Sequence, residues 1–199
     1  VLRDVARRTD LIAASRLNSA SDLYLKTENL QVTGSFKVRG AYYKISQLTA
    51  EERAKGVIAC SAGNHAQGVA LAATSMGIKS VVCMPDGAPL MKVESTKRLG
   101  AQVELVKGVY DDAYNRAVEL QKERNLTFIH PFNDPDVIAG QGTIGLELLK
   151  QLPDMDAVIV PVGGGGLISG VAFAIIREDM LDRIVRDLPT MMSFRTHVE

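Results

Sequence analysis

Residues 57–85 read VIACSAGNHAQGVALAATSMGIKSVVCMP, with two apolar runs on either side of a helical pattern. The runs at residues 57–60 and 80–84 are rich in β-branched residues, which is typical of strands that are covered on both faces. Between them, small apolar side chains recur over residues 64–76 at the spacing of one helix face, at positions Ala66, Val69, Ala70 and Ala73. A strand, a helix and a second strand in this order predict a βαβ unit with a parallel sheet.

The same alternation extends along most of the chain. Further apolar runs of strand length lie at residues 23–25, 103–106, 127–129 and 158–162. A second helical pattern covers residues 111–123, and a third, with mixed charge, covers residues 178–188. The sequence therefore predicts an α/β fold, with open and mostly parallel sheets that carry helices on both faces.

The composition is that of a globular protein. In 199 residues, 46% are hydrophobic and 23 basic side chains balance 23 acidic ones, which excludes a disordered chain. The basic residues form no stripe, so we expect no nucleic-acid partner and no anionic membrane partner. No apolar stretch reaches the length of a membrane span and no signal peptide is recognisable, so we expect a soluble cytoplasmic protein.

Cysteines and histidines give no framework for a disulfide or a metal. Cys60 and Cys83 each lie inside an apolar run, where a buried and reduced thiol is expected. The three histidines and two isolated cysteines lack the spacing of metal ligands, so we predict no metal site.

Four successive glycines, Gly163, Gly164, Gly165 and Gly166, follow the apolar run that ends at Val162. They lead into an apolar segment, residues 171–176, that we interpret as a helix. Glycines expose backbone N–H groups at a helix N-terminus, where the helix dipole also favours an anion. We therefore favour a phosphate-binding loop over a merely flexible turn.

A second glycine-rich stretch, residues 140–145, has the spacing G-x-G-x-x-G of a dinucleotide-binding loop. No convincing strand leads into it, and no acidic residue follows about twenty positions later to hold a ribose. We interpret these glycines as sites where a helix approaches a neighbouring backbone closely.

Residues 61–68 open a helix after the predicted strand that ends at Cys60. Small and amide-bearing residues at a helix start bind a carboxylate through backbone N–H groups, a serine hydroxyl and an asparagine amide. Ordinary capping of the helix by Ser61 or Asn64, with His65 as a partly buried structural residue, explains the pattern equally well.

Lys37 lies near the start of a predicted helix, beside the aromatic Phe36. A desolvated lysine near a helix N-terminus has a lowered pKa and can form a Schiff base with a carbonyl compound. Composition alone does not distinguish this residue from an ordinary surface lysine.

Together and in order, residues 35–40 (SFKVRG), 61–65 (SAGNH) and 163–167 (GGGGL) resemble the pyridoxal-phosphate enzymes of the tryptophan-synthase-β type. Within these, the sequence is most similar to the threonine/serine ammonia-lyases. Residues 25–31, 84–89 and 131–147 add to the resemblance, which spans roughly residues 5–175.

The resemblance implies a role for each predicted site residue. Lys37 would bind the cofactor pyridoxal 5'-phosphate as a Schiff base and later remove the α-proton of the substrate. The remaining cofactor-binding residues would be Phe36, Asn64, Gly163, Gly164, Gly165, Gly166 and Leu167. The carboxylate of a small amino-acid substrate would bind the loop formed by Ser61, Ala62, Gly63, Asn64 and His65.

The same resemblance implies two lobes. Residues 1–45 and 136–199 would form a large cofactor-binding lobe, and residues 46–135 a small lobe. The family's chains continue well past the glycine loop, and residues 177–199 do not match that continuation, so the large lobe is expected to be incomplete at its C-terminus. A homo-oligomer is also implied.

The implied reaction is the β-elimination of water from L-threonine or L-serine, which yields a 2-oxo acid and ammonia. Serine racemases, a close alternative, usually carry a second serine where this chain has Ala62. A catalytically silent fragment that binds a phosphate remains a second alternative. A nicotinamide oxidoreductase is a third, and it rests only on the glycines of residues 140–145.

Overall fold

The computed structural model describes residues 1–17 and 21–175. One half of the molecule is built on a parallel sheet of four strands, in the order β5-β4-β3-β6. The strands are β3 (Val57–Cys60), β4 (Ser80–Pro85), β5 (Gln102–Val106) and β6 (Thr127–Phe128). The mixed α/β fold with a parallel sheet, and the four apolar runs that form this sheet, are thus confirmed.

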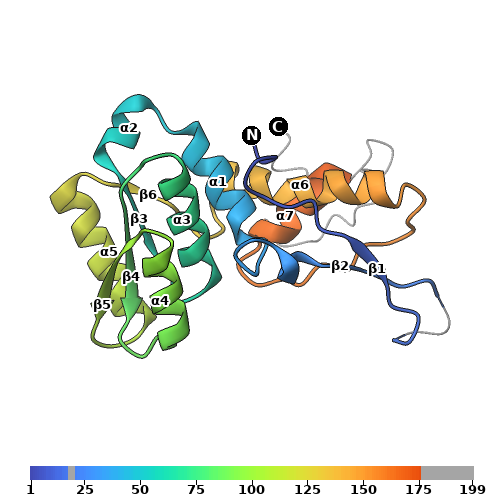
Figure 1. Ribbon diagram of the computed structural model, residues 1–199, viewed down its shortest axis with the longest axis horizontal. Helices are drawn as coiled ribbons and strands as arrows, with labels where there is room; N and C mark the ends of the chain where they lie inside the picture. Colours follow the sequence, from blue (N-terminus) through green and yellow to red (C-terminus); the bar gives the residue numbers. More distant parts are fainter. Residues whose placement is uncertain (18–20, 176–199) are drawn as a thin grey trace, which may run out of the picture.

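Helices cover both faces of this sheet (Figure 1). Alternate residues of β3 point to opposite sides, as the pleat of a strand requires. Val57 and Ala59 pack on the side of α1 (Lys37–Gln47) and α3 (Asn64–Ser75). Ile58 and Cys60 pack on the other side, against α5 (Tyr110–Arg124). The βαβ unit predicted from residues 57–85 is therefore the centre of a three-layer sandwich.

Two short helices complete this half. Helix α2 (Ala50–Lys55) begins at a capping box, in which Thr49 and Glu52 bond each other's backbone N–H groups. Helix α4 (Leu90–Arg98) covers the same side of the sheet as α3, through Val93. Cys60 and Cys83, partners in the register of β3 and β4, are free and buried, as predicted.

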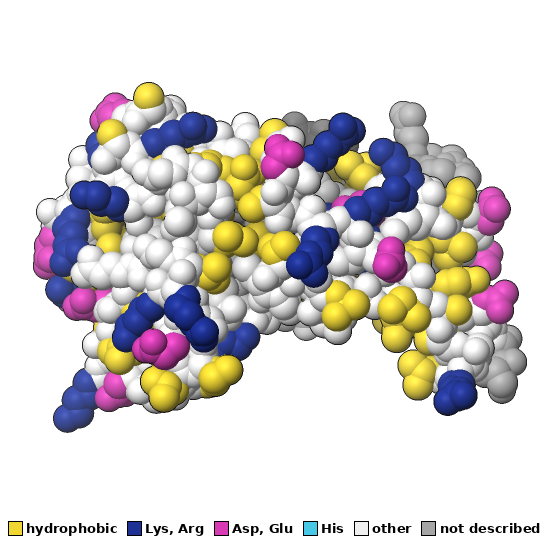
Figure 2. Space-filling view, viewed as in Figure 1, with side chains coloured by type: hydrophobic (Ala, Val, Ile, Leu, Met, Phe, Trp, Pro, Cys, Tyr) yellow, Lys and Arg dark blue, Asp and Glu magenta, His cyan; other side chains and the backbone are white. Residues whose placement is uncertain are grey.

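The other half of the molecule combines segments from both ends of the described chain. From the N-terminal end it contains an antiparallel pair, β1 (Leu11–Ala13) and β2 (Tyr24–Lys26), and the single-turn helix η1 (Glu28–Leu30). It also contains the helices α6 (Pro135–Gln151) and α7 (Gly166–Ile175). In Figure 1, helix α1 lies between this half and the sheet. Exposed apolar side chains, among them Ile12, Tyr24 and Leu25, lie on the strand pair and its surroundings (Figure 2).

Two strand predictions in this half need correction. The run at residues 23–25 forms β2, but β2 pairs antiparallel with β1, which the sequence analysis missed. Residues 158–162 form no strand and belong to neither sheet of the described residues. Ile159 is instead 90% exposed, and Val160 packs against the contact between α6 and α7. The predicted helix at residues 178–188 lies outside the described residues.

The glycines of residues 140–145 lie inside α6, where they allow the close contacts that we predicted. A Cβ on Gly140 would lie 2.6 Å from the carbonyl oxygen of Arg39 in α1. A Cβ on Gly142 would lie 2.8 Å from the carbonyl oxygen of Gly170 in α7. Helix α6 therefore touches both α1 and α7 backbone to backbone, and the oxidoreductase alternative loses its only support.

Among the described residues, no helix has both the length and the apolar composition needed to cross a bilayer. The same part of the chain holds no group of three or more His, Cys, Asp or Glu side chains placed to bind a metal ion.

Candidate active site

Lys37 is the first residue of α1, as the sequence analysis expected. Its amine donates a 2.6 Å hydrogen bond to the carbonyl oxygen of Pro131 and lies 5.4 Å from the centre of the Phe36 ring. Burial lowers the pKa of Lys37 below its usual value of 10.5. A larger fraction of neutral, nucleophilic amine is therefore present near neutral pH than for a surface lysine.

The loop between β3 and α3 contains Ser61, Ala62 and Gly63, all of which are partly exposed. The residue that precedes α3 is Gly63, which has no side chain to cap the helix, and the Ser61 hydroxyl accepts from the Gly63 N–H at 3.2 Å. The Asn64 side-chain oxygen accepts from Lys92 at 2.9 Å. Neither Ser61 nor Asn64 therefore caps α3, and carboxylate binding by this loop stays a prediction.

His65 differs from the rest of this loop because it is only 3% exposed. Its Nε2 lies 2.9 Å from the carbonyl oxygen of Ile129, which only accepts, so Nε2 carries the hydrogen. Burial lowers the pKa of His65 to about 4, although the hydrogen bond to Ile129 acts in the opposite direction, and the charge of Lys37 lowers the pKa further. His65 is thus a neutral side chain, and its Nδ1 is buried with no hydrogen-bond partner among the described residues.

The four glycines form a loop that ends at the N-terminus of α7, since Gly166 is the first residue of that helix. Gly165 has a φ of +86°, a backbone conformation that favours glycine. Gly163 and Gly165 face open space, whereas a Cβ on Gly164 or Gly166 would collide with Phe132. The side chain of Leu167 packs against the apolar contact between α6 and α7, which leaves only its backbone free to bind a ligand.

One short segment, Ile129–Phe132, touches all three predicted parts of the site. Its Ile129 carbonyl accepts from His65, its Pro131 carbonyl accepts from Lys37, and Phe132 lies against Gly164 and Gly166. No motif in the sequence marks this segment as part of the site. The proline-rich sequence that begins at His130 was the available signal, but it resembles an ordinary loop.

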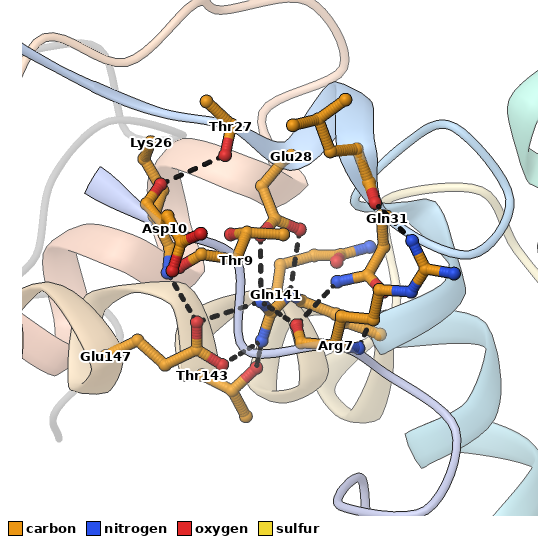
Figure 3. Close-up of polar contacts among 12 residues, drawn as sticks. Arg7, Thr9, Asp10, Lys26, Thr27, Glu28, Gln31, Gln141, Thr143 and Glu147 are labelled. Carbon is orange, nitrogen blue, oxygen red and sulfur yellow. Dashed lines mark hydrogen bonds and ion pairs between the residues drawn. The ribbon is translucent and has the colours of Figure 1, made fainter. Parts of the chain in front are cut away.

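A second group that sequence analysis missed surrounds Arg39, two residues after Lys37. The Arg39 side chain is 1% exposed and donates two 2.8 Å hydrogen bonds to Glu28. It also donates bonds of 2.7 and 3.0 Å to Glu147 and one of 3.1 Å to Thr143. Figure 3 shows Glu28, Thr143 and Glu147 within this network. Burial alone would lower the pKa of Arg39, but its bonds to the two carboxylates raise it, so the charge is retained.

The described residues fit a ligand that is anionic at one end and carries a carbonyl group at the other. An amine of lowered pKa, a glycine loop at a helix N-terminus and a buried histidine nitrogen without a partner lie around one segment. An α/β fold with such a site is suited to bind a phosphorylated aldehyde through the lysine.

Comparison with known proteins identifies the family of this chain. The model of the pyridoxal-phosphate-dependent enzyme family matches residues 2–185. This chain therefore belongs to that family, whose cofactor is pyridoxal phosphate.

Individual relatives are similar over most of this chain. L-threonine ammonia-lyase of Thermotoga maritima is 57% identical over 176 residues, which are 87% of this chain and 44% of that protein. The processed form of threonine deaminase isoform 2 from Solanum lycopersicum has a TM-score of 0.84 and 46% identity, over 87% of this chain and 48% of that one. Maize serine racemase has a TM-score of 0.85 and 39% identity, over 87% and 54%. The chain spans about half the length of the curated relatives that it matches.

Proposed function

We propose that this chain carries the cofactor-binding lysine and the substrate-binding loop of a threonine ammonia-lyase. The observation that carries the proposal is the Lys37 amine, which has a lowered pKa and a hydrogen bond to the segment that also contacts His65 and the glycine loop. The similarity to L-threonine ammonia-lyase and to threonine deaminase supports the choice of substrate.

The residues of this chain would divide the work of binding. Gly163, Gly164, Gly165, Gly166 and the backbone of Leu167 would hold the phosphate of the cofactor at the N-terminus of α7. Asn64 and the Phe36 ring would contact the cofactor ring. The loop of Ser61, Ala62 and Gly63, together with the first N–H groups of α3, would bind the substrate carboxylate, with the neutral His65 beneath it.

In the proposed reaction, the Lys37 amine takes the proton from the α-carbon of L-threonine. Pyridoxal phosphate, when bound, supplies the conjugated ring that accepts the electron pair of that C–H bond. The β-hydroxyl leaves with a proton as water, and water then hydrolyses the enamine product. The balance is one threonine to one 2-oxobutanoate and one ammonia, and L-serine would give pyruvate and ammonia.

A serine racemase is the second candidate, because maize serine racemase is similar in structure. Ala62 argues against it, since an alanine has no group that could return a proton to the opposite face of the α-carbon. A product assay separates the two, because a lyase releases 2-oxo acid and ammonia from L-serine whereas a racemase releases D-serine.

Borohydride reduction of the full-length protein with pyridoxal phosphate tests the proposal. We expect visible absorption that disappears on reduction, and a phosphopyridoxyl group on the peptide that contains Lys37. Lys37→Arg, which keeps the positive charge, should prevent both. An adduct on another lysine, or none at all in the full-length protein, would contradict the assignment and favour a catalytically silent phosphate-binding protein.

We further propose that residues 46–135 form a small lobe and residues 1–45 with 136–199 a large one. The position of the four-stranded sheet supports this division, because all of its strands lie between residues 46 and 135. Homo-oligomerisation is proposed on the family resemblance, and a cytoplasmic location on the buried, reduced thiols of Cys60 and Cys83, which suit a reducing compartment. Sedimentation of the full-length protein and fractionation of cells would test them.

A further inference from the structure

His130 fixes the turn that carries most of the Ile129–Phe132 segment. Its Nδ1 accepts two backbone hydrogen bonds, from the N–H of Asn133 at 2.8 Å and from the N–H of Phe132 at 3.3 Å. Asparagine and aspartate side chains hold turns in the same way, by accepting from the backbone two and three residues later. Because Nδ1 accepts, it carries no proton, and the hydrogen of the neutral ring is on Nε2.

The imidazole ring is itself held in place by aromatic neighbours. Its centre lies 4.7 Å from that of Phe132 in an edge-to-face contact, with an angle of 85° between the planes. Its centre also lies 6.4 Å from that of the Phe128 ring in β6. The acceptor nitrogen therefore has a defined position relative to the sheet.

The turn fixed by His130 contains two of the contacts that define the candidate site. The carbonyl of Pro131 receives the hydrogen bond from the Lys37 amine. A Cβ on Gly166 would lie 2.7 Å from the carbonyl oxygen of Phe132, and the Phe132 ring lies against Gly164. A change in this turn would therefore displace the lysine partner and the wall of the glycine loop together.

We propose that His130 is a positioning residue, whose neutral Nδ1 holds the 130–133 turn and thereby places both the Lys37 amine and the glycine loop. His130 acts through Pro131 and Phe132 and need not touch the substrate. The expected effect on cofactor binding rests on the proposed function, whereas the effect on Lys37 itself does not.

The proposal includes a pH dependence with a defined sign. Protonation of Nδ1 would remove the acceptor for both backbone N–H groups, so the turn is held only while His130 is neutral. Burial and the charge of Lys37 disfavour the protonated ring, whereas the carboxylate of Asp134 favours it, and the pKa of His130 is lowered overall. His65, the other histidine that interacts with His130, is neutral. The turn should therefore lose its hydrogen bonds to His130 only when the pH falls below neutrality.

Three substitutions in the full-length protein separate the acceptor from the ring. His130→Asn keeps an oxygen that can accept from residues 132 and 133, His130→Phe keeps the aromatic contacts without the acceptor, and His130→Ala removes both. The first measurement is the rate at which an amine-reactive reagent labels Lys37 in the cofactor-free protein, followed by peptide mapping from pH 6 to pH 10. The second is the affinity for pyridoxal phosphate, from the visible absorption of the bound form.

We expect His130→Asn to behave like the unmodified protein in both measurements. His130→Phe and His130→Ala should change the labelling profile of Lys37 and weaken the affinity for pyridoxal phosphate about tenfold, as expected for a lost anchoring hydrogen bond. The affinity of the unmodified protein should also fall in mild acid, and that of His130→Asn should fall less.

Each contrary result has one meaning. Unchanged labelling and affinity in His130→Phe would overturn the proposal, and so would a His130→Asn variant as impaired as His130→Phe. If His130→Ala does not fold, His130→Phe still decides, because it preserves the ring packing. If labelling responds as expected but no variant or parent binds pyridoxal phosphate, the positioning role holds and the proposed function fails.

Discussion

The guanidinium of Arg39 and the carboxylate of Glu147 form two parallel hydrogen bonds, of 2.7 and 3.0 Å, that join α1 to α6. The adjacent edge of the guanidinium, formed by Nε and Nη2, binds both oxygens of Glu28. Lys26 donates to Glu147 at 2.5 Å, so two cations and two carboxylates are matched in one buried network. Burial would raise the pKa of Glu147, but the hydrogen bonds from Arg39 and Lys26 lower it.

Removal of the Arg39 charge should destabilise the fold strongly. Arg39→Met leaves Glu28 without its cation and Glu147 with only one of its two cations, Lys26. Breaking a buried ion pair in this way costs about 3 kcal/mol of stability. Arg39→Lys keeps the charge but not the paired geometry, so it should lose less. Urea unfolding would measure both, with Arg98→Met as the control for an exposed arginine. Equal stability of Arg39→Met and the parent would contradict the role of the network.

The close approach of α6 to α1 should not tolerate a methyl group. In Gly140→Ala, the new Cβ would lie 2.6 Å from the backbone of both Arg39 and Gly40, and only a shift of a helix can relieve that collision. We expect a loss of about 2–3 kcal/mol in the free energy of unfolding. Gly87→Ala is the matched control, because a Cβ there meets nothing within 4 Å. If both variants unfold alike, the backbone contact has been misassigned.

His65 should make the protein less stable in mild acid. Its pKa is about 4 in the fold against 6.5 in the unfolded chain, so the unfolded chain binds the extra proton first as the pH falls. The contribution of neutral His65 to the free energy of unfolding is complete above pH 6.5. It is lost progressively toward pH 4, by up to about 3 kcal/mol. Unfolding of the parent and of His65→Gln at pH 7.5 and pH 5 measures this, since glutamine can still donate to Ile129. The difference between the two proteins should shrink or reverse at the lower pH, and a difference independent of pH would refute the assignment.

The two cysteines should resist thiol reagents in the native state. Burial raises the pKa of Cys60 to about 11 and that of Cys83 to about 12, so almost no thiolate is present near neutral pH. We expect both thiols to react slowly with a disulfide reagent at pH 8 and rapidly after denaturation. Fast native labelling at either residue would show that the sheet opens between β3 and β4.

The sheet could be predicted from sequence because its strands carry their own signal. Residues 57–60 and 80–84 are apolar throughout or nearly so, and burial on both faces of a parallel strand produces that composition directly. Residues 158–162 carry the same signal but form no strand in the described structure. A strand needs an apolar sequence, which the segment itself supplies. It also needs a hydrogen-bonding neighbour, which depends on the rest of the chain.

The candidate site was predicted in part for a similar reason. Lys37, the loop before α3 and the glycine loop are each visible as local patterns at helix starts. The contacts that hold them together are not local, since Lys37 and Pro131 are 94 residues apart and Arg39 and Glu147 are 108 apart. Nothing in the sequence around His130 indicates that its ring accepts two backbone hydrogen bonds.

Helix α6 lies against α1 through Gly140 and against α7 through Gly142, with backbone atoms in contact on both sides. Side chains between helices can change rotamer and absorb a small displacement, but backbones in contact cannot. The backbones of α1, α6 and α7 are therefore held at a fixed spacing, and with them the helix starts that carry Lys37 and Gly166. In the proposed function, such a frame would select its ligand by length: an aldehyde whose carbonyl carbon is too near its phosphate, or too far from it, would not reach both ends at once.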